Sequence, residues 1–328
     1  MPANLSPEYI EAERRYRAAK SHEERLSCLE EMLSKIPKHK GTEKMQAGIR
    51  RKISQLKQQA EAQNRKRKGH SYKVNAEGAG QIVLVGAPNT GKSALLAAVT
   101  NAEPEVADYP FTTRAPMPGM MPYLDIRIQL VDLPAISSEH LEGWVADVIK
   151  AADGVLIFCD LASDDPVVQI DESVALLRDF GIELLPPTQE PVPELRGNQK
   201  KAIIAANKID LPDTREMFDL VSEMQTSLLP ILAVSCVSGQ GLETLKHQVF
   251  ELLKIMRVYS KQPGKPPDMN EPFTIHRGAN LMEFAGVVHK DFVEQLKYGR
   301  VWGSGKFEGQ IIKHDHILQD GDIVELHL

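Results

Sequence analysis

The stretch that decides the fold is residues 82–93, IVLVGAPNTGKS. A short apolar run leads into a glycine-rich turn, and helix-forming residues follow the turn. The turn has the spacing G-x-x-x-x-G-K-[ST], with glycines at Gly86 and Gly91 and the pair Lys92 and Ser93 behind them. Glycines let backbone N–H groups wrap phosphate oxygens, and the N-terminus of the next helix adds positive potential. The sequence therefore predicts a strand, a phosphate-binding loop and a helix.

We expect the whole loop and the start of its helix to contact the phosphates. Lys92 can bridge the β- and γ-phosphates of a nucleotide, and the Ser93 hydroxyl can bind Mg²⁺, a hard cation that prefers oxygen ligands. The other expected contacts are Gly86, Ala87, Pro88, Asn89, Thr90, Gly91 and Ala94.

Short apolar runs alternate with helical segments after this loop. The runs are 154–161, 201–208 and 231–235, and the predicted helices are 92–100, 139–151, 167–180, 214–228 and 241–256. Buried strands that alternate with helices indicate an α/β domain with a doubly wound, mostly parallel sheet. Another stretch, 123–133, alternates early between apolar and polar residues and predicts a half-exposed strand.

A carboxylate and an NKID motif follow two of these strands at their carboxyl ends, where open α/β sheets bind ligands. Asp132 is suited to hold the ligand shell of Mg²⁺. Asp210 can accept two hydrogen bonds from the N1–H and the exocyclic amine of guanine, a pair that adenine lacks. Asn207 can brace the phosphate loop, and Lys208 can lie along the base plane.

The last predicted strand ends at Ser235 and Cys236, where a backbone amide can meet the guanine O6. NKID or the Ser-Cys pair alone arises readily by chance. All of these motifs in order, each at a strand's carboxyl end, predict a guanine-nucleotide site. An ATPase is the rival interpretation, and Asp210 opposes it.

The composition is that of a soluble globular protein. Of the 328 residues, 42% are hydrophobic and 26% are charged. No apolar run has the length of a membrane span, and the N-terminal residues lack the apolar core of a secretory signal. The three cysteines, Cys28, Cys159 and Cys236, are far apart and lack zinc-site spacing. We therefore expect a reducing, cytoplasmic setting.

The net charge of −6 hides a split along the chain. Residues 1–78 hold 18 Lys and Arg against 10 Asp and Glu, a balance of +8, and the remainder has a balance of −14. A basic arm on an acidic body suggests contact with a polyanion. The expected divisions are a basic helical hairpin at 1–78, a nucleotide-binding domain at 79–260, a Pro-rich linker at 261–271 and a small unit at 272–328.

The chain resembles the Obg-group, translation-factor-like GTPases, and within them the developmentally regulated GTP-binding (DRG) proteins and their prokaryotic relatives. The resemblance covers nearly the whole chain. It lies in IPKHKGTEKMQAGIRRKISQLK (36–57), in YPFTTRAPMPG (109–119), which is similar to switch I, and in DLPA (132–135), similar to the start of switch II. Residues 271–328, beginning EPFTIHRGANLMEF, look like a TGS domain, a small β-grasp module.

The resemblance implies a GTP-driven switch with slow intrinsic hydrolysis, acting near ribosomes or RNA. Of Thr112 and Thr113, the second is favoured as the switch I threonine that joins Mg²⁺ and senses the γ-phosphate, because Arg114 follows it. Asn89 matches the asparagine of potassium-activated GTPases, where K⁺ supplies charge beside the phosphates. The expected catalytic residues are therefore Lys92, Thr113 and Asn89.

Two residues depart from the usual pattern. Ile136 stands where Ras-like enzymes carry a catalytic glutamine, and an apolar side chain cannot orient water. Ala135 replaces the family glycine; its backbone N–H survives, but its Cβ restricts φ. Nucleotide binding should persist, and the alternative to a slow GTPase is a GTP-binding platform or adaptor with negligible turnover.

Two surfaces are candidates for partners, and we expect a monomer that does not bind membranes. Several basic residues of the N-terminal arm can meet RNA phosphates: Arg50, Arg51, Lys52, Arg65, Lys66, Arg67 and Lys68. In the TGS-like unit, Trp302 beside Arg300 is the best candidate for a stacking surface. Alternatively, the stripe of Leu26, Leu29 and Leu33 docks an accessory protein.

Overall fold

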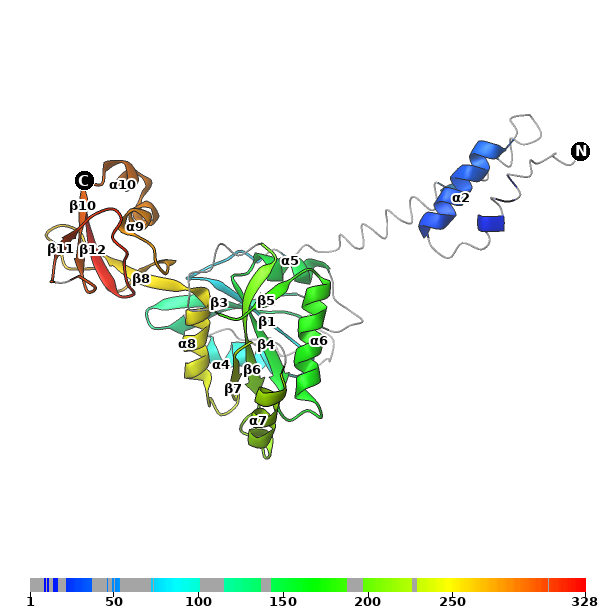
Figure 1. The fold of residues 1–328 in the computed structure, drawn as a ribbon, viewed down its shortest axis with the longest axis horizontal. Helices are drawn as coiled ribbons and strands as arrows, with labels where there is room; N and C mark the ends of the chain where they lie inside the picture. Colours follow the sequence, from blue (N-terminus) through cyan, green and yellow to red (C-terminus); the bar gives the residue numbers. More distant parts are fainter. Residues whose placement is uncertain are drawn as a thin grey trace, which may run out of the picture. The chain divides into compact units, whose positions relative to one another are not determined.

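The computed structural model describes residues 9, 11, 14–16, 22–36, 46, 49, 51–53, 72, 74–100, 115–136, 143–187, 197–225, 229–305 and 307–328 (Figure 1). The chain forms two compact units, 1–71 and 72–328. No helix in the described ranges is long and apolar enough to cross a membrane.

The first unit has a small apolar core around helix α2, His22–Lys35. The buried members of this core are Tyr9, Leu29, Met32, Ile36 and Ile49. Leu33 packs against the same core, so two leucines of the predicted docking stripe contribute to the unit's own packing. The side chain of Leu26 and the basic run 65–68 lie outside the described residues.

A seven-stranded sheet organises the first part of the second unit. Its strands are β1 Gln81–Gly86, β2 Met117–Tyr123, β3 Ile126–Asp132, β4 Gly154–Asp160, β5 Glu183–Leu185, β6 Gln199–Asn207 and β7 Ile231–Ala233. The order is β2-β3-β1-β4-β6-β5, and β7 also pairs with β6. Among the described strands of this sheet, β2 alone runs antiparallel to its neighbour, which confirms the predicted mostly parallel α/β sheet.

Helices cover both faces of this sheet (Figure 1). One face carries α4 Lys92–Val99 and α8 Leu242–Leu253, and the other carries α5 Gly143–Ala151, α6 Pro166–Asp179 and α7 Thr214–Met224. All six residues of β1 are buried. Ile82 and Leu84 belong to the core beneath α4 and α8, and Val83 and Val85 belong to the core on the opposite face. This follows because successive side chains of a strand point to opposite faces.

The predicted strand 123–133 is in fact part of a hairpin. The chain turns at Leu124 and Asp125, and Leu124 adopts a left-handed φ of 51° there. Strand β2 precedes the turn and contains Pro118 and Pro122, and the sequence analysis does not predict it. Proline lacks an N–H for the ladder and is tolerated on an edge strand such as β2.

A five-stranded sheet forms the C-terminal part, in the order β11-β10-β12-β8-β9. The strands are β8 Ile255–Ser260, β9 Phe273–His276, β10 Tyr298–Trp302, β11 Gln310–Ile312 and β12 Asp322–His327. The pair β8 and β12 is parallel, and the other pairs are antiparallel. Helices α9 Leu281–Val288 and α10 Lys290–Gln295 supply Phe284 and Phe292 to the core beneath the sheet. This is the β-grasp arrangement that the resemblance implies.

This sheet begins earlier than the small unit that the sequence analysis placed at 272–328. Strand β8 follows α8 directly, through a left-handed turn at Lys254 with φ 53°. The Pro-rich stretch 261–271 then connects β8 to β9, which are neighbours in one sheet. Its proline composition thus reflects a connection within the sheet.

Candidate nucleotide site

The phosphate loop turns sharply between β1 and α4, and its two glycines lie against neighbouring strands. Gly86 has φ 152°, and a Cβ there would lie 2.5 Å from the carbonyl oxygen of Phe158. Gly91 has φ 100°, and a Cβ there would lie 2.1 Å from Nδ2 of Asn207. Both positions therefore require glycine, for backbone conformation and for space.

Lys92, at the start of α4, is buried and folded back over the loop. Its Nζ donates hydrogen bonds to the carbonyl oxygens of Gly86 and Ala87, both at 2.9 Å. Burial lowers the pKa of Lys92 to about 8, and the charge of Asp132 acts in the opposite direction. An anion strongly stabilises an ammonium group that water solvates poorly. The loop and Lys92 are therefore suited to bind a phosphate, and we call them the phosphate seat.

Ser93 and Asp132 are brought together from α4 and the end of β3. The Ser93 hydroxyl donates a hydrogen bond to Oδ2 of Asp132. Oδ1 of Asp132 is buried and has no hydrogen-bond partner among the described residues. Burial raises the pKa of Asp132, against the effects of the Ser93 hydrogen bond and the Lys92 charge. An orphaned carboxylate oxygen beside a hydroxyl fits the oxygen ligands that Mg²⁺ prefers.

Asn207 joins three strand ends. Its Nδ2 donates to the carbonyl oxygen of Thr90 at 2.9 Å, and its Oδ1 accepts from the backbone N–H of Cys236 at 3.1 Å. The Cys236 Sγ lies 3.8 Å from the carbonyl oxygen of Gly91. The side chain therefore holds the phosphate loop, the end of β6 and the loop after β7 in one arrangement.

The rest of the NKID motif presents two different charges. Lys208, with a left-handed φ of 72°, forms an ion pair with Asp160 at the end of β4. Asp210 is exposed, and its carboxylate has no hydrogen-bond partner within the described ranges. The ion pair was not predicted, although Asp160 lies near the end of the apolar run 154–161, at the same edge of the sheet.

The loop after β7 is a tight turn built on Ser235. Its buried hydroxyl accepts hydrogen bonds from the backbone N–H groups of Val237 at 3.2 Å and Ser238 at 2.9 Å. Burial raises the pKa of the neighbouring Cys236 thiol to about 11. Cys236 is therefore an uncharged thiol at neutral pH and contributes packing and its backbone amide.

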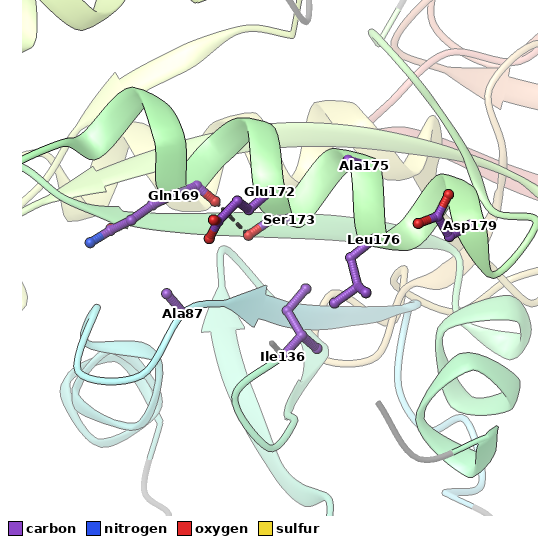
Figure 2. Close-up of a pocket in the computed structure, with 8 residues that line it drawn as sticks. All are labelled: Ala87, Ile136, Gln169, Glu172, Ser173, Ala175, Leu176 and Asp179. Carbon is purple, nitrogen blue, oxygen red and sulfur yellow. Dashed lines mark hydrogen bonds between the residues drawn. The ribbon is translucent and has the colours of Figure 1, made fainter. Parts of the chain in front are cut away.

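The start of the predicted switch II segment contacts the phosphate loop. The backbone N–H of Ile136 donates to the carbonyl oxygen of Gly86 at 3.4 Å, and the Ile136 side chain is buried. Figure 2 shows Ile136 and Ala87 facing helix α6 across a pocket of about 160 Å³. The other residues that line this pocket are Gln169, Glu172, Ser173, Ala175, Leu176 and Asp179.

The polar groups inside this pocket already have partners. Gln169 Oε1 accepts from the backbone N–H of Asp160 at 2.9 Å, and the Ser173 hydroxyl donates to the carbonyl oxygen of Gln169 at 2.7 Å. Glu172 and Asp179 are exposed at its rim. The pocket thus combines an apolar floor at Ile136 with an acidic rim.

The remaining predicted site residues are placed only in part. Pro88, Asn89 and Ala94 are exposed, and Asn89 has a left-handed φ of 62° at the tip of the loop. Ala135 is half-buried beside Ile136. Thr112 and Thr113 lie outside the described residues, as does the whole segment 101–114.

Comparisons with known proteins show the family to which the chain belongs. A family model described as a 50S ribosome-binding GTPase matches residues 81–208, and the TGS domain model matches residues 256–328. A GTP-binding protein of Methanocaldococcus jannaschii is 30% identical over 360 residues, which cover 93% of this chain and 92% of that protein. The chain belongs to this family of GTP-binding proteins.

The wider set of relatives confirms the resemblance to the DRG proteins. Developmentally-regulated G-protein 1 of Arabidopsis thaliana is 28% identical over 365 residues, 92% of this chain and 90% of its own. The solved YchF GTPase of Schizosaccharomyces pombe shares the fold, with a TM-score of 0.52 and 13% identity, over 78% of this chain and all of that one. The GTP-binding protein is therefore a P-loop GTPase with a C-terminal TGS domain.

The lowered pKa of Lys92 predicts proton uptake when a nucleotide binds. A bound phosphate favours the ammonium, so the complex holds a proton that the free protein has lost in part above pH 8. Affinity for GDP should fall as the pH rises through about 8, by up to about tenfold per pH unit.

Isothermal titration calorimetry in buffers of different ionisation enthalpy measures this uptake. Most of a proton is expected at about pH 8.5, and much less at about pH 7, where Lys92 is already charged. Equal uptake at both values would contradict the assignment of the titrating group to Lys92.

Proposed function

We propose that this GTP-binding protein is a slow, Mg²⁺-dependent GTPase that acts as a switch on the ribosome or on structured RNA. The observation that carries the switch is the contact between the phosphate loop and the start of switch II. Asp132 accepts a hydrogen bond from Ser93, and Ile136 donates one to Gly86. A nucleotide that changes the phosphate loop therefore acts directly on residues 132–136.

Mg²⁺ would be held by Ser93 and Asp132, with Thr113 proposed as a ligand from switch I. When bound, the ion neutralises charge on the β- and γ-phosphates. Lys92 and the loop N–H groups bind and orient the same phosphates from the protein side. Asn207 keeps this loop in register with the base site, where Asp210 would accept from guanine.

Hydrolysis in this chain would depend on charge rather than on a water-orienting side chain. Ile136 is apolar and buried, so it cannot position the attacking water. Asn89, exposed at the tip of the loop, is proposed to help hold K⁺ against the phosphates, where the ion supplies charge in place of an arginine. These features support a low intrinsic rate with stimulation by K⁺.

A second candidate is a GTP-binding platform or adaptor with negligible turnover. The buried Ile136 and the Cβ of Ala135 favour it, because both reduce the means for hydrolysis and for movement at switch II. In that case bound GTP stabilises the fold that a partner recognises.

Engagement of ribosome or RNA is proposed for a monomer in the cytoplasm. It is supported by the description of the matching GTPase model and by the basic composition of residues 1–78. Arg51 and Lys52 are exposed on the first unit. In the TGS domain, Trp302 is half-buried, with the Lys261 ammonium 4.7 Å from its ring centroid.

Guanine selectivity should depend on the free carboxylate of Asp210. The protein is expected to bind GDP at least about a hundredfold more tightly than ADP, since a site built for paired donors rejects a base that lacks them. Asp210→Asn should reduce GDP affinity by a similar factor and leave the fold intact. Competition titrations with a fluorescent nucleotide measure both effects, and Asp213→Asn, at another exposed carboxylate in the same loop, is the matched control. Equal GDP and ADP affinity in the natural chain would exclude a guanine site.

Single-turnover hydrolysis in KCl and in NaCl distinguishes the slow GTPase from the platform. We expect phosphate release in both salts, faster in KCl by roughly tenfold, because K⁺ adds positive charge at the phosphates. Asn89→Gly keeps the left-handed loop conformation and removes the side-chain oxygen, so it should abolish the difference between the salts. No release in either salt would leave the platform as the function. A large gain in rate for Ala135→Gly would show that the natural chain is held slow at this position.

Ribosome co-sedimentation with GDP, GTP and a non-hydrolysable GTP analogue tests the switch itself. The GTP analogue is expected to increase the bound fraction over GDP, and added salt should weaken binding steeply if basic residues meet RNA phosphates. Equal sedimentation with all three nucleotides would remove the switch from the function.

A further inference from the structure

The turn between β2 and β3 is bound to the first strand of the TGS sheet. Nη1 of Arg257 donates to Oδ1 of Asp125 at 2.7 Å, and the Tyr259 hydroxyl donates to Oδ2. Arg257 and Tyr259 both lie on β8, and Asp125 lies in the turn of the GTPase-domain hairpin. Both oxygens of one carboxylate thus link the nucleotide-binding sheet to the TGS sheet.

Arg257 is fixed in place by a second carboxylate within the TGS domain. Asp320 accepts from Nε of Arg257 at 3.1 Å, from Nη2 at 2.7 Å and from its backbone N–H at 2.7 Å. The planar guanidinium is therefore oriented by a bidentate pair, and the remaining nitrogen points at Asp125. The side chains of Arg257 and Asp125 are 15% and 24% exposed, so water screens the pair only in part. We call the set Asp125, Arg257, Tyr259 and Asp320 the clamp.

The charge of the clamp is stable at physiological pH. Burial acts to raise the pKa of Asp125, but the hydrogen bonds from Tyr259 and Arg257 lower it below the ordinary value overall. The hydrogen bond to Asp320 raises the pKa of Arg257, although burial opposes it. Both partners therefore stay ionised, and the clamp responds to displacement rather than to pH.

One strand connects the clamp to the nucleotide site. Asp125 directly precedes β3, and Asp132, beside Ser93, is the last residue of β3. At ~3.3 Å per residue, the strand is about 20 Å long. Strand β2 pairs with β3 along its whole length, from Tyr123 opposite Ile126 to Met117 opposite Asp132. The predicted switch I, 109–119, runs into the start of β2, so the open end of the hairpin meets both switch segments and its closed end meets the TGS domain.

We propose that the β2–β3 hairpin transmits the nucleotide state to the TGS domain through the clamp. The inference rests on the proposed GTP switch and names the element that regulates the TGS domain. A nucleotide that moves Asp132 or the start of β2 displaces a hydrogen-bonded hairpin, and the clamp carries this displacement to β8. Coupling between two sites is reciprocal, so a partner that moves the TGS domain changes the relative affinity for GDP and GTP by the same factor.

A second ion pair provides a matched control. Glu251 on α8 accepts two hydrogen bonds from Arg277 after β9, both at 2.8 Å. This pair also joins the GTPase domain to the TGS domain, but its two residues hydrogen-bond each other and not the hairpin, which α8 contacts through His247 and Tyr123 instead. Glu251→Gln therefore removes an interdomain charge pair while it keeps the clamp and the Tyr123–His247 hydrogen bond of the hairpin.

Hydrogen exchange of the full chain with GDP and with a non-hydrolysable GTP analogue tests the proposal. In the natural chain, exchange should differ between the two nucleotides around Asp132 and also at 256–260. Asp125→Asn should abolish the difference at 256–260 and keep the one around Asp132. The milder Tyr259→Phe should reduce the difference at 256–260. Glu251→Gln should leave the differences at both places unchanged. In parallel, Asp125→Asn should shift the ratio of GDP to GTP-analogue affinity by about fivefold or more, and Glu251→Gln by far less.

The outcomes separate the clamp from the switch. A difference around Asp132 without one at 256–260 in the natural chain would overturn the clamp and leave the proposed switch standing. A difference at 256–260 that persists in Asp125→Asn would also overturn the clamp. No difference at either place would overturn both.

Discussion

The nucleotide site depends on one side chain, the amide of Asn207. It donates to the phosphate loop at Thr90 and accepts from the loop after β7 at Cys236. Its nitrogen fills the space beside Gly91 where any Cβ would lie, at 2.1 Å. A buried amide with both ends bonded fixes the relative position of its partners, because leaving either end unpaired is costly. The phosphate half and the base half of the site are thereby held as one rigid surface.

The site also shows how an acidic protein can bind a polyanion. The residues after 78 carry a charge balance of −14, yet the proposed phosphate seat combines backbone N–H groups with the buried Lys92. Burial destabilises the ammonium and, at the same place, the carboxylate of Asp132. Each charge is poorly solvated by water. A phosphate would therefore stabilise the ammonium, and a divalent cation would stabilise the carboxylate, more than the surrounding water does. Local desolvation, and not net charge, sets the affinity of such a seat.

The sequence predicts the parts of the fold that local patterns encode, namely the phosphate loop and the buried strands β1, β4 and β6 with their helices. It does not reveal β2, whose prolines are compatible with a strand only because that strand lies at an edge. It also misses the pairing of β8 with the TGS sheet and the ion pair of Lys208 with Asp160. The contact of Asp125 with Arg257 joins residues 132 positions apart. Such contacts follow from the packed arrangement of whole elements, which no periodicity or motif spacing records.

Strand β3 brings together two restraints that look unrelated in the sequence. At one end, Ala135 follows Asp132 closely and has less backbone freedom than a glycine would have there. At the other end, Asp125 is held by two side chains of β8. A strand restrained at both ends moves only when its supports move with it. On this view the proposed slow turnover and the proposed coupling to the TGS domain share one physical cause: a hairpin held at both ends shifts only together with the TGS sheet, so its two states are also two states of that sheet.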